Sequence, residues 1–439
     1  MTHKLNSYES FFWLLGRKEP FIIQYTIGLQ GKLQKKFMVQ ALQFLQQQHP
    51  ILQHTIGKQR PFVFKTTRQP IPLFIHRRKD QDSSENIASV ALETPMPLRP
   101  SDPIMRADWV RGVDTHEIIF SIEHAFCDFR SMVGLACDLL KFLDQLHSGQ
   151  RDIKLNFYPW YPELKTLLPQ HKPKAVPPEF AVPFRDETPL AAKAPFLFNV
   201  SYRHLLTLEE SRTIVVQAKK NNCTVQGIFC AAMIYTLNAY GLEHKLNSES
   251  FCFTPCDLRP VLNAQMTGKE LGNFVTGIFH PFKIGAEKEF RKLALEISQQ
   301  IKSTIDSDLF TRDTEGLSAL YHTRMTSKQA MQIMKAREYC GFVSNAGIVP
   351  FADQYQNFTL QQVRCGVASP ILSGRTHLFW LGVQTIRGQM QLELFDTGIG
   401  DQREKFAKFM RNFLETVFAA IDHDASGREC EPDAKAVQR

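Results

Sequence analysis

Two residues in the first third of the chain have the types and spacing of a catalytic base and a supporting carboxylate. His124 follows an apolar run at residues 118–122, and Asp128 lies four residues later, at the start of an amphipathic segment. A neutral imidazole can accept a proton near pH 7, and a histidine at a strand end projects from a rigid element. A carboxylate at a helix start can cap backbone N–H groups or pair with an arginine. General-base chemistry at His124 is therefore compatible with these residues.

The HxxxD spacing is weak evidence when it stands alone. The chain has 14 histidines, and His76 with Asp80 repeats the spacing. The three residues between that second pair are basic, which is typical of a solvated loop. The structural alternative for His124 is a histidine whose hydrogen bonds are satisfied at a strand end. On spacing alone, that alternative is the better interpretation.

The segments around His124 predict a strand that leads into it and a helix that follows it. Residues 117–122 are apolar and strand-like, and residues 129–146 carry apolar side chains at helical spacing. Strands are also expected at 21–29, 51–56, 62–65, 73–75 and 104–113, and a helix at 33–49, which Pro50 ends.

A proline-rich stretch divides the chain into two halves. Nine prolines lie between Pro159 and Pro195, a density that favours neither a long helix nor a central strand. The stretch is too long for a turn and is typical of a crossing linker. We expect an N-terminal lobe at 1–158, a crossover linker at 159–195, a C-terminal lobe at 196–425 and a polar tail at 426–439.

The second half also mixes strand and helix patterns. Because the two do not alternate strictly, they predict a mixed α/β (α+β) fold rather than a pure parallel barrel. Strands are expected at 198–206, 250–256, 275–282, 341–344, 358–367, 377–385 and 389–395, and helices at 209–220, 225–240, 287–305, 327–335 and 404–421.

Composition excludes several classes of protein. The 439 residues predict two or three domains, and the content of 43% hydrophobic and 22% charged residues is ordinary for a globular protein. No run of about twenty apolar residues occurs, and no signal-peptide pattern, so we expect a cytoplasmic protein without integral membrane association. The net charge of +8 is scattered and accompanies no nucleic-acid motif, although it is compatible with a phosphate-bearing or acidic partner.

Other catalytic signatures are missing. The sequence has no GxSxG, Walker A, HExxH or GxGxxG pattern. The nine cysteines are best interpreted as buried free thiols. Cys252 and Cys256 are four residues apart, but no second ligand pair follows at zinc spacing, so no metal site is assigned.

Several segments together are more specific than the HxxxD spacing. Residues 123–129 resemble the HHxxxDG motif of the acyltransferase superfamily that includes peptide-synthetase condensation domains and chloramphenicol acetyltransferases. Residues 255–260 (PCDLRP) and 343–347 (VSNAG) resemble its DLRP and SNxG elements, and Gly272-Asn273 opens another strand. The order of these pieces spans most of the chain and is most similar to polyketide-associated acyltransferases. Taken singly, Asp257 with Arg259, Asn273 and Asn345 are better interpreted as ordinary loop and turn residues.

The resemblance implies two chloramphenicol-acetyltransferase-like lobes with a tunnel at their interface. It implies acyl transfer from a CoA or carrier-protein thioester to a hydroxyl or amine acceptor, with His124 as general base and no permanently bound cofactor. The acyl-CoA or phosphopantetheinyl carrier is a co-substrate, and a monomer suffices because one chain supplies both lobes. The implied roles are structural for Asp128, with Arg259 as its first candidate partner, and tunnel-lining for Glu123, Phe129, Asn273 and Ser344.

Two residues depart from the motif. Glu123 replaces the usual first histidine, and Phe129 replaces the usual glycine. A carboxylate near the base could raise its pKa, although adjacent strand residues point to opposite faces. Phe129 could distort the turn or narrow the channel. These departures keep open the alternative of a catalytically silent homologue that binds an acyl carrier or acyl chain as a partner module.

Overall fold

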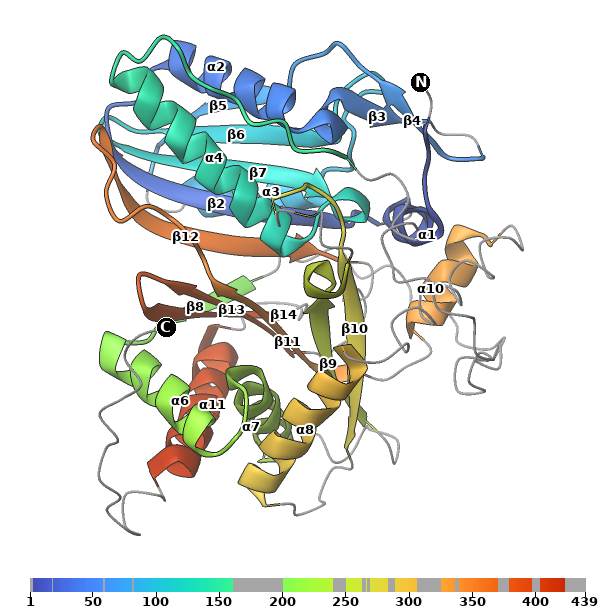
Figure 1. Ribbon diagram of the computed structural model, residues 1–439, viewed down its shortest axis with the longest axis vertical. Coiled ribbons are helices and arrows are strands. Elements are labelled where there is room, and N and C mark those ends of the chain that lie inside the picture. Colours follow the sequence, from blue (N-terminus) through green and yellow to red (C-terminus); the bar gives the residue numbers. More distant parts are fainter. Residues whose placement is uncertain are drawn as a thin grey trace.

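The computed structural model has two lobes, one above the other in Figure 1. It describes residues 3–17, 19–57, 60–80, 83–160, 200–239, 250–262, 266, 269–282, 289–305, 325–335, 339–369, 379–396 and 403–422. Most of the expected linker and the whole expected tail lie outside the described residues.

The first lobe is built on a five-stranded sheet. The strand order is β12 (Phe358–Ala368), β2 (Ile22–Gly31), β7 (Thr115–Glu123), β6 (Met105–Arg111) and β5 (Leu73–Arg77). Helix α4 (Phe129–His147) packs on one face beside α2 (Lys35–Gln48), and α3 (Ser83–Glu93) packs on the other. Alternation along β2 explains this arrangement. The Tyr25 ring meets Phe129 of α4, whereas Gln24 Nε2 donates to the Ala88 carbonyl of α3 at 2.9 Å.

Smaller elements border this lobe beside His124. Helix α1 (Ser7–Gly16) precedes β2, and a 3-10 turn, η2 (His124–Phe126), joins β7 to α4. A three-stranded sheet combines β1 (His3–Lys4), β4 (Val63–Thr66) and β3 (His54–Ile56), with the turn η1 (Pro50–Gln53) leading into β3.

The second lobe is built on a six-stranded sheet. The order is β10 (Val275–Phe282), β9 (Ser250–Asp257), β11 (Tyr339–Ile348), β13 (Phe379–Ile386), β14 (Gln389–Asp396) and β8 (Val200–Leu205). Strand β11 runs parallel to β9 and β13, and the other pairs are antiparallel. The expectation of a mixed sheet is therefore confirmed. Four helices lie below the sheet in Figure 1, namely α6 (Leu208–Lys220), α7 (Val225–Ala239), α8 (Phe290–Ile305) and α11 (Arg403–Asp422).

One strand crosses between the lobes. Strand β12 comes from the second half of the chain, yet it pairs with β2 along almost its whole length, from Phe358 beside Gly31 to Ala368 beside Ile22. The expected boundaries at residues 158 and 196 do not capture this exchange. The pairing depends on a contact between residues more than 300 positions apart, which no local pattern encodes.

Two helices were not expected from the sequence, α1 and α3. Helix α1 has a complete capping box, because Asn6 Oδ1 accepts from the Glu9 N–H and the Glu9 carboxylate accepts from the Asn6 N–H. This Asn-x-x-Glu spacing before an apolar run is a signal that could have revealed the helix. Two further elements complete the described fold, α10 (Ser327–Lys335) beside α1 and the 3-10 turn η5 (Arg259–Val261). Among the described helices, none combines the length and the apolar character that crossing a membrane requires.

Candidate active site

His124 is held by its backbone from both sides. It is the first residue of η2, directly after β7 ends. Its N–H donates to the Phe21 carbonyl at 2.8 Å, and its own carbonyl accepts from Asn273 Nδ2 at 2.9 Å. Phe21 belongs to the first lobe, whereas Asn273 precedes β10 of the second. The histidine is therefore fixed at the contact between the lobes.

The imidazole of His124 has one nitrogen committed and one available. Nδ1 lies 2.9 Å from the Cys127 carbonyl. A carbonyl can only accept, so Nδ1 carries the proton and Nε2 keeps its lone pair. Burial lowers the pKa of His124, which keeps the ring neutral near pH 7. The rings of Phe21 and Phe12 flank it at centroid distances of 4.7 and 5.6 Å. The arrangement supplies a neutral, oriented base.

Asp128 is the N-cap of α4, and its carboxylate is engaged in structural contacts. Its carboxylate accepts from the Ser131 N–H at 2.8 Å and from the Phe274 N–H at 2.9 Å. Burial alone would raise the pKa of Asp128, but the Arg259 guanidinium and these donors hold it below its usual value. The His124 ring is not among its hydrogen-bond partners in the described residues. These contacts give Asp128 a positioning role for the start of α4.

Arg259 is the ion-pair partner of Asp128. Its Nη1 lies 3.0 Å from Asp128 Oδ2 and its Nη2 lies 3.1 Å from Oδ1, and the two side chains are 5% and 1% exposed. Nη2 also donates to Ser131 Oγ at 2.8 Å, and Nη1 donates to Asp257 Oδ1 at 2.9 Å. The structure thus brings together His124, Asp128, Arg259 and Asn273. The residue Ser131, which the sequence analysis missed, carries no motif signal of its own.

The Asn273 amide makes a hydrogen bond through its nitrogen but not through its oxygen in the described residues. The side chain is buried at 7% exposure, and Nδ2 is committed to His124. Oδ1 has no hydrogen-bond partner among the described residues. Because the acceptor at His124 is a carbonyl, the amide orientation is decided by chemistry. Asn273 therefore positions the His124 backbone and keeps a free acceptor beside it.

The Glu123 carboxylate is buried beside Gly16 of α1. It is 2% exposed, and a Cβ added at Gly16 of α1 would lie 2.4 Å from its Oε1. Oε1 has no partner among the described residues, and burial raises the pKa of Glu123 well above its usual value. The pKa of His124 is lowered rather than raised. Glu123 is not among the groups that shift the pKa of His124, because burial favours its uncharged form, which exerts no charge on the imidazole.

Phe129 does not distort the turn after the motif. It begins α4 behind an ordinary N-cap, Asp128, with φ −97° and ψ 175°. Its ring contacts Tyr25 at a centroid distance of 5.6 Å, and the Tyr25 hydroxyl donates to Gln384 Oε1 of β13 at 2.9 Å. Of the two consequences expected for this residue, the first is excluded. The ring instead occupies space where the two lobes meet.

Ser344 lies apart from this group. It is half-buried on β11, where its neighbour across the sheet is Gly382 of β13. No contact in the described residues joins it to His124. Its possible place in a tunnel remains a prediction.

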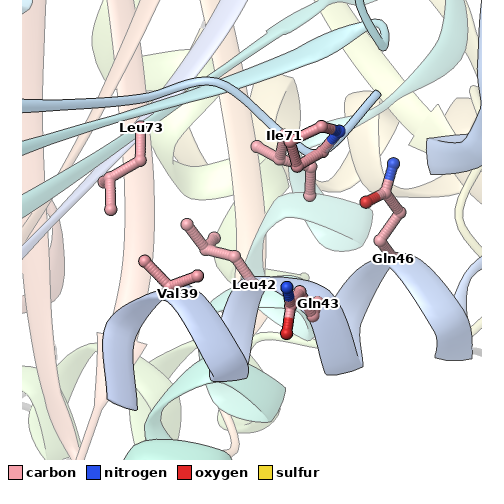
Figure 2. A pocket seen from close by; sticks show the side chains of 7 residues that line it. Val39, Leu42, Gln43, Gln46, Ile71 and Leu73 are labelled. Atoms are coloured by element: carbon pink, nitrogen blue, oxygen red, sulfur yellow. The ribbon is translucent and has the colours of Figure 1, made fainter. Parts of the chain in front are cut away.

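A shallow hollow elsewhere in the first lobe holds no chemistry. Figure 2 shows it between α2 and the segment that leads into β5, with Val39 and Leu42 facing Ile71 and Leu73. None of its lining side chains titrates. Gln46, at one end, uses its Nε2 on the carbonyls of Leu52 and Gln69. We do not assign a site there.

Comparison with known proteins supports the resemblance. Residues 197–395 match the family described as phthiocerol/phthiodiolone dimycocerosyl transferase C-terminus. No curated protein matches the sequence significantly.

Several solved structures share the fold over nearly the whole chain. Polyketide synthase associated protein 5 from Mycobacterium tuberculosis is 14% identical, with a TM-score of 0.67 over 96% of this chain and 98% of that one. Trichothecene 15-O-acetyltransferase from Fusarium sporotrichioides is 13% identical, with a TM-score of 0.71 over 95% of each chain. The first condensation domain of the CDA synthetase is 12% identical, with a TM-score of 0.64 over 96% of this chain and 97% of that one.

At these identities the structural likeness establishes the fold, and the family match covers the second lobe. Both agree with the order of the motifs along the chain. The expected resemblance is therefore confirmed: residues 197–395 match this transferase family, and the whole chain shares the fold of condensation domains and acyltransferases of known structure.

Proposed function

We propose that the protein transfers an acyl group from a pantetheine thioester, on CoA or a carrier protein, to a hydroxyl or amine acceptor, with His124 as general base. One observation carries the proposal. The Cys127 carbonyl commits Nδ1 of His124 as a donor, which leaves Nε2 as an acceptor on a ring fixed between the lobes.

The reaction follows from this geometry. Nε2 accepts the proton of the acceptor hydroxyl or amine while that oxygen or nitrogen bonds to the thioester carbonyl carbon. The carbonyl π electrons move to oxygen and give a tetrahedral oxyanion. Its collapse breaks the carbon–sulfur bond, and the imidazolium returns its proton to the leaving thiolate. The products are an ester or amide and a free pantetheine thiol, and no acyl-enzyme forms.

The neighbouring residues act by positioning. Asp128 and Arg259 fix the start of α4, and Cys127, which directly precedes Asp128, orients the imidazole. Asn273 fixes the His124 carbonyl, and its free Oδ1 is available to a donor group on a substrate. Preorganisation of this kind places the base without a reorganisation step during the reaction.

The test is thiol release. Purified protein is incubated with a panel of acyl-CoAs and acyl-carrier proteins, each with simple alcohols and amines, and free pantetheine thiol is measured by chromatography. His124→Ala is expected to lower turnover by about 10²–10⁴-fold, the usual contribution of a general base. His76→Ala is the matched control, since His76 occupies the second HxxxD spacing but pairs with the buried Asp108 at 2.8 Å.

Two outcomes would count against the proposal. Equal turnover in His124→Ala and wild type would remove His124 from the mechanism. Binding of an acyl thioester without thiol release from any pair would favour the silent homologue that serves as an acyl-binding partner.

A further inference from the structure

A row of aromatic rings crosses the second lobe on the face of the sheet opposite its helices. The rings belong to directly paired residues of five neighbouring strands, so they stand side by side. The centroid distances between successive rings are 5.0, 4.5, 4.2 and 6.2 Å. We call this row the aromatic ladder, and its members are Phe279, Phe253, Phe342, Trp380 and Phe395.

The ladder faces the first lobe rather than the helical core. Residues that alternate with its members, such as Val343 and Leu381, are buried in the core beneath the sheet. Since successive strand residues point to opposite faces, the rings point to the other side. Four of the five are only half-buried, and Phe395 alone is fully buried. These four rings pack against the hydrophobic core of the first lobe, yet each keeps part of its surface exposed.

Strand β10 connects the ladder to the candidate active site. Asn273, which binds the His124 carbonyl, precedes β10 by two residues, and Gly277 follows four residues later. The Phe253 ring lies over Gly277, where an added Cβ would come within 2.0 Å of it. At the rise of a strand, this ring is ~13 Å along the chain from Asn273. Ser344, two residues from Phe342 on the same face, adds another small side chain beside the rings.

The position of His124 indicates which part of the substrates the aromatic ladder contacts. The nucleophile must lie beside Nε2, next to the Phe12 and Phe21 rings of the first lobe. The face of the second lobe is then left for the acyl group. Aromatic faces and edges attract other π systems by 0.5–1.5 kcal/mol beyond the area they bury, whereas a saturated chain gains only burial.

We propose that the aromatic ladder binds the acyl group of the thioester and selects a planar conjugated acyl group, aryl or polyene, over a saturated chain. This inference rests on the proposed function. It names the substrate class of that same site and assigns Phe253, Phe342 and Trp380 the role of specificity determinants.

The experiment measures binding, so that it does not depend on turnover. Cinnamoyl-pantetheine and nonanoyl-pantetheine have acyl groups with equal numbers of carbons, and the saturated one is the more hydrophobic. Both are titrated into the His124→Ala protein by calorimetry and by tryptophan fluorescence. We expect the cinnamoyl thioester to bind about 2- to 12-fold more tightly, the factor expected for one stacked pair. Its binding is also expected to quench Trp380.

Matched variants separate the ladder from general apolar packing. Phe342→Leu keeps an apolar side chain and is expected to abolish the preference. Phe379→Leu makes the same change on the opposite face, where Phe379 stacks on Phe409 of α11, and is expected to keep it. Trp380→Phe keeps a ring and is expected to retain the preference while losing most of the quenching. Circular dichroism confirms that each variant is folded.

The inference is overturned by a folded protein that binds both thioesters equally or prefers the saturated one. It is also overturned if Phe342→Leu leaves the preference intact, or if cinnamyl alcohol binds and quenches while neither thioester binds. Thiol release by the wild-type protein with saturated donors would meanwhile keep the proposed function standing, so the two failures are distinguishable.

Discussion

The His124 ring combines an oriented lone pair with a surrounding that favours its neutral form. The rings of Phe12 and Phe21 lie against it, and the Cys127 carbonyl accepts a hydrogen bond from its Nδ1–H. Aromatic neighbours solvate an imidazolium poorly, so burial lowers the pKa of His124 below the usual 6.5. We therefore expect the proposed base to stay neutral in mildly acidic solution.

A pH profile tests this property. A general base works in its neutral form, so kcat/KM falls only when the pH drops through the pKa of the free enzyme. Because that pKa is lowered, we expect the acid limb below pH 6.5. The measurement is kcat/KM for thiol release between pH 5 and 8, a range in which histidine is the only type of side chain with an unperturbed pKa, and His76→Ala serves as the control for the other histidines. An acid limb above pH 6.5 would contradict the assigned environment.

Glu123 predicts a pH-dependent stability. Its folded pKa is raised by burial, so the unfolded chain releases this proton at a lower pH than the folded one does. Stability from this group is thus fully present below pH 4.5 and is lost as the pH rises toward the folded pKa. Glu123→Gln cannot titrate. As the pH rises from 4.5 toward the folded pKa, the unfolding free energy of the variant is expected to increase relative to that of wild type by about 1.4 kcal/mol per pH unit.

Urea unfolding at several pH values from 4 to 8 checks this expectation. Glu85 is the control, since it is 59% exposed and pairs with Arg364 on the surface of the same lobe. Glu85→Gln is expected to change stability by less than about 1 kcal/mol. A constant difference between Glu123→Gln and wild type over the whole range would show that Glu123 is ionised in the folded protein.

At the scale of the elements, the start of α4 is where the lobes are joined. Asp128 caps α4, and Arg259, 131 residues away, comes from η5 beside β9. Asp128→Ala leaves the guanidinium buried and without this partner, which typically costs 3–5 kcal/mol. We expect a loss of about that size in unfolding free energy, together with slower thiol release because Cys127 no longer orients the imidazole firmly.

A second ion pair between the same elements is the control. Arg130, 58% exposed, pairs with Asp257 at 2.6 Å. Arg130→Ala is expected to cost less than about 1 kcal/mol, because an exposed pair is screened by water. Equal losses in the two variants would mean that burial adds nothing to the Asp128–Arg259 pair.

At the scale of the whole molecule, the exchange of β12 makes each lobe depend on the other. Residues 1–160 alone would leave the β2 edge unpaired, and an exposed edge strand promotes aggregation. We expect this fragment to be unfolded or aggregated when expressed alone. Co-expression with residues 196–439 is expected to give a folded one-to-one complex by size-exclusion chromatography and circular dichroism. A monomeric, folded fragment 1–160 would contradict this dependence.

The sequence by itself determined those features that arise from neighbouring residues. The strand into His124, the cap at Asp128 and the helix at 327–335 follow from periodicity and capping, which act within a few positions. The resemblance to the superfamily followed from the order of its motifs along the chain. Helix α1 was missed despite its capping box, because its apolar run is short. Helix α3 was missed as well.

Only the tertiary structure decided the long-range arrangement. The pairing of β12 with β2, the burial of Glu123 beneath Gly16 and the alignment of five rings depend on the register of strands distant in sequence. A strand pattern gives the two faces of a strand but not its neighbours, so a one-residue change of register would move every ring to the other face. For the same reason, motif order made Arg259 a candidate partner for Asp128, but only the fold could bring the two charges to 3.0 Å.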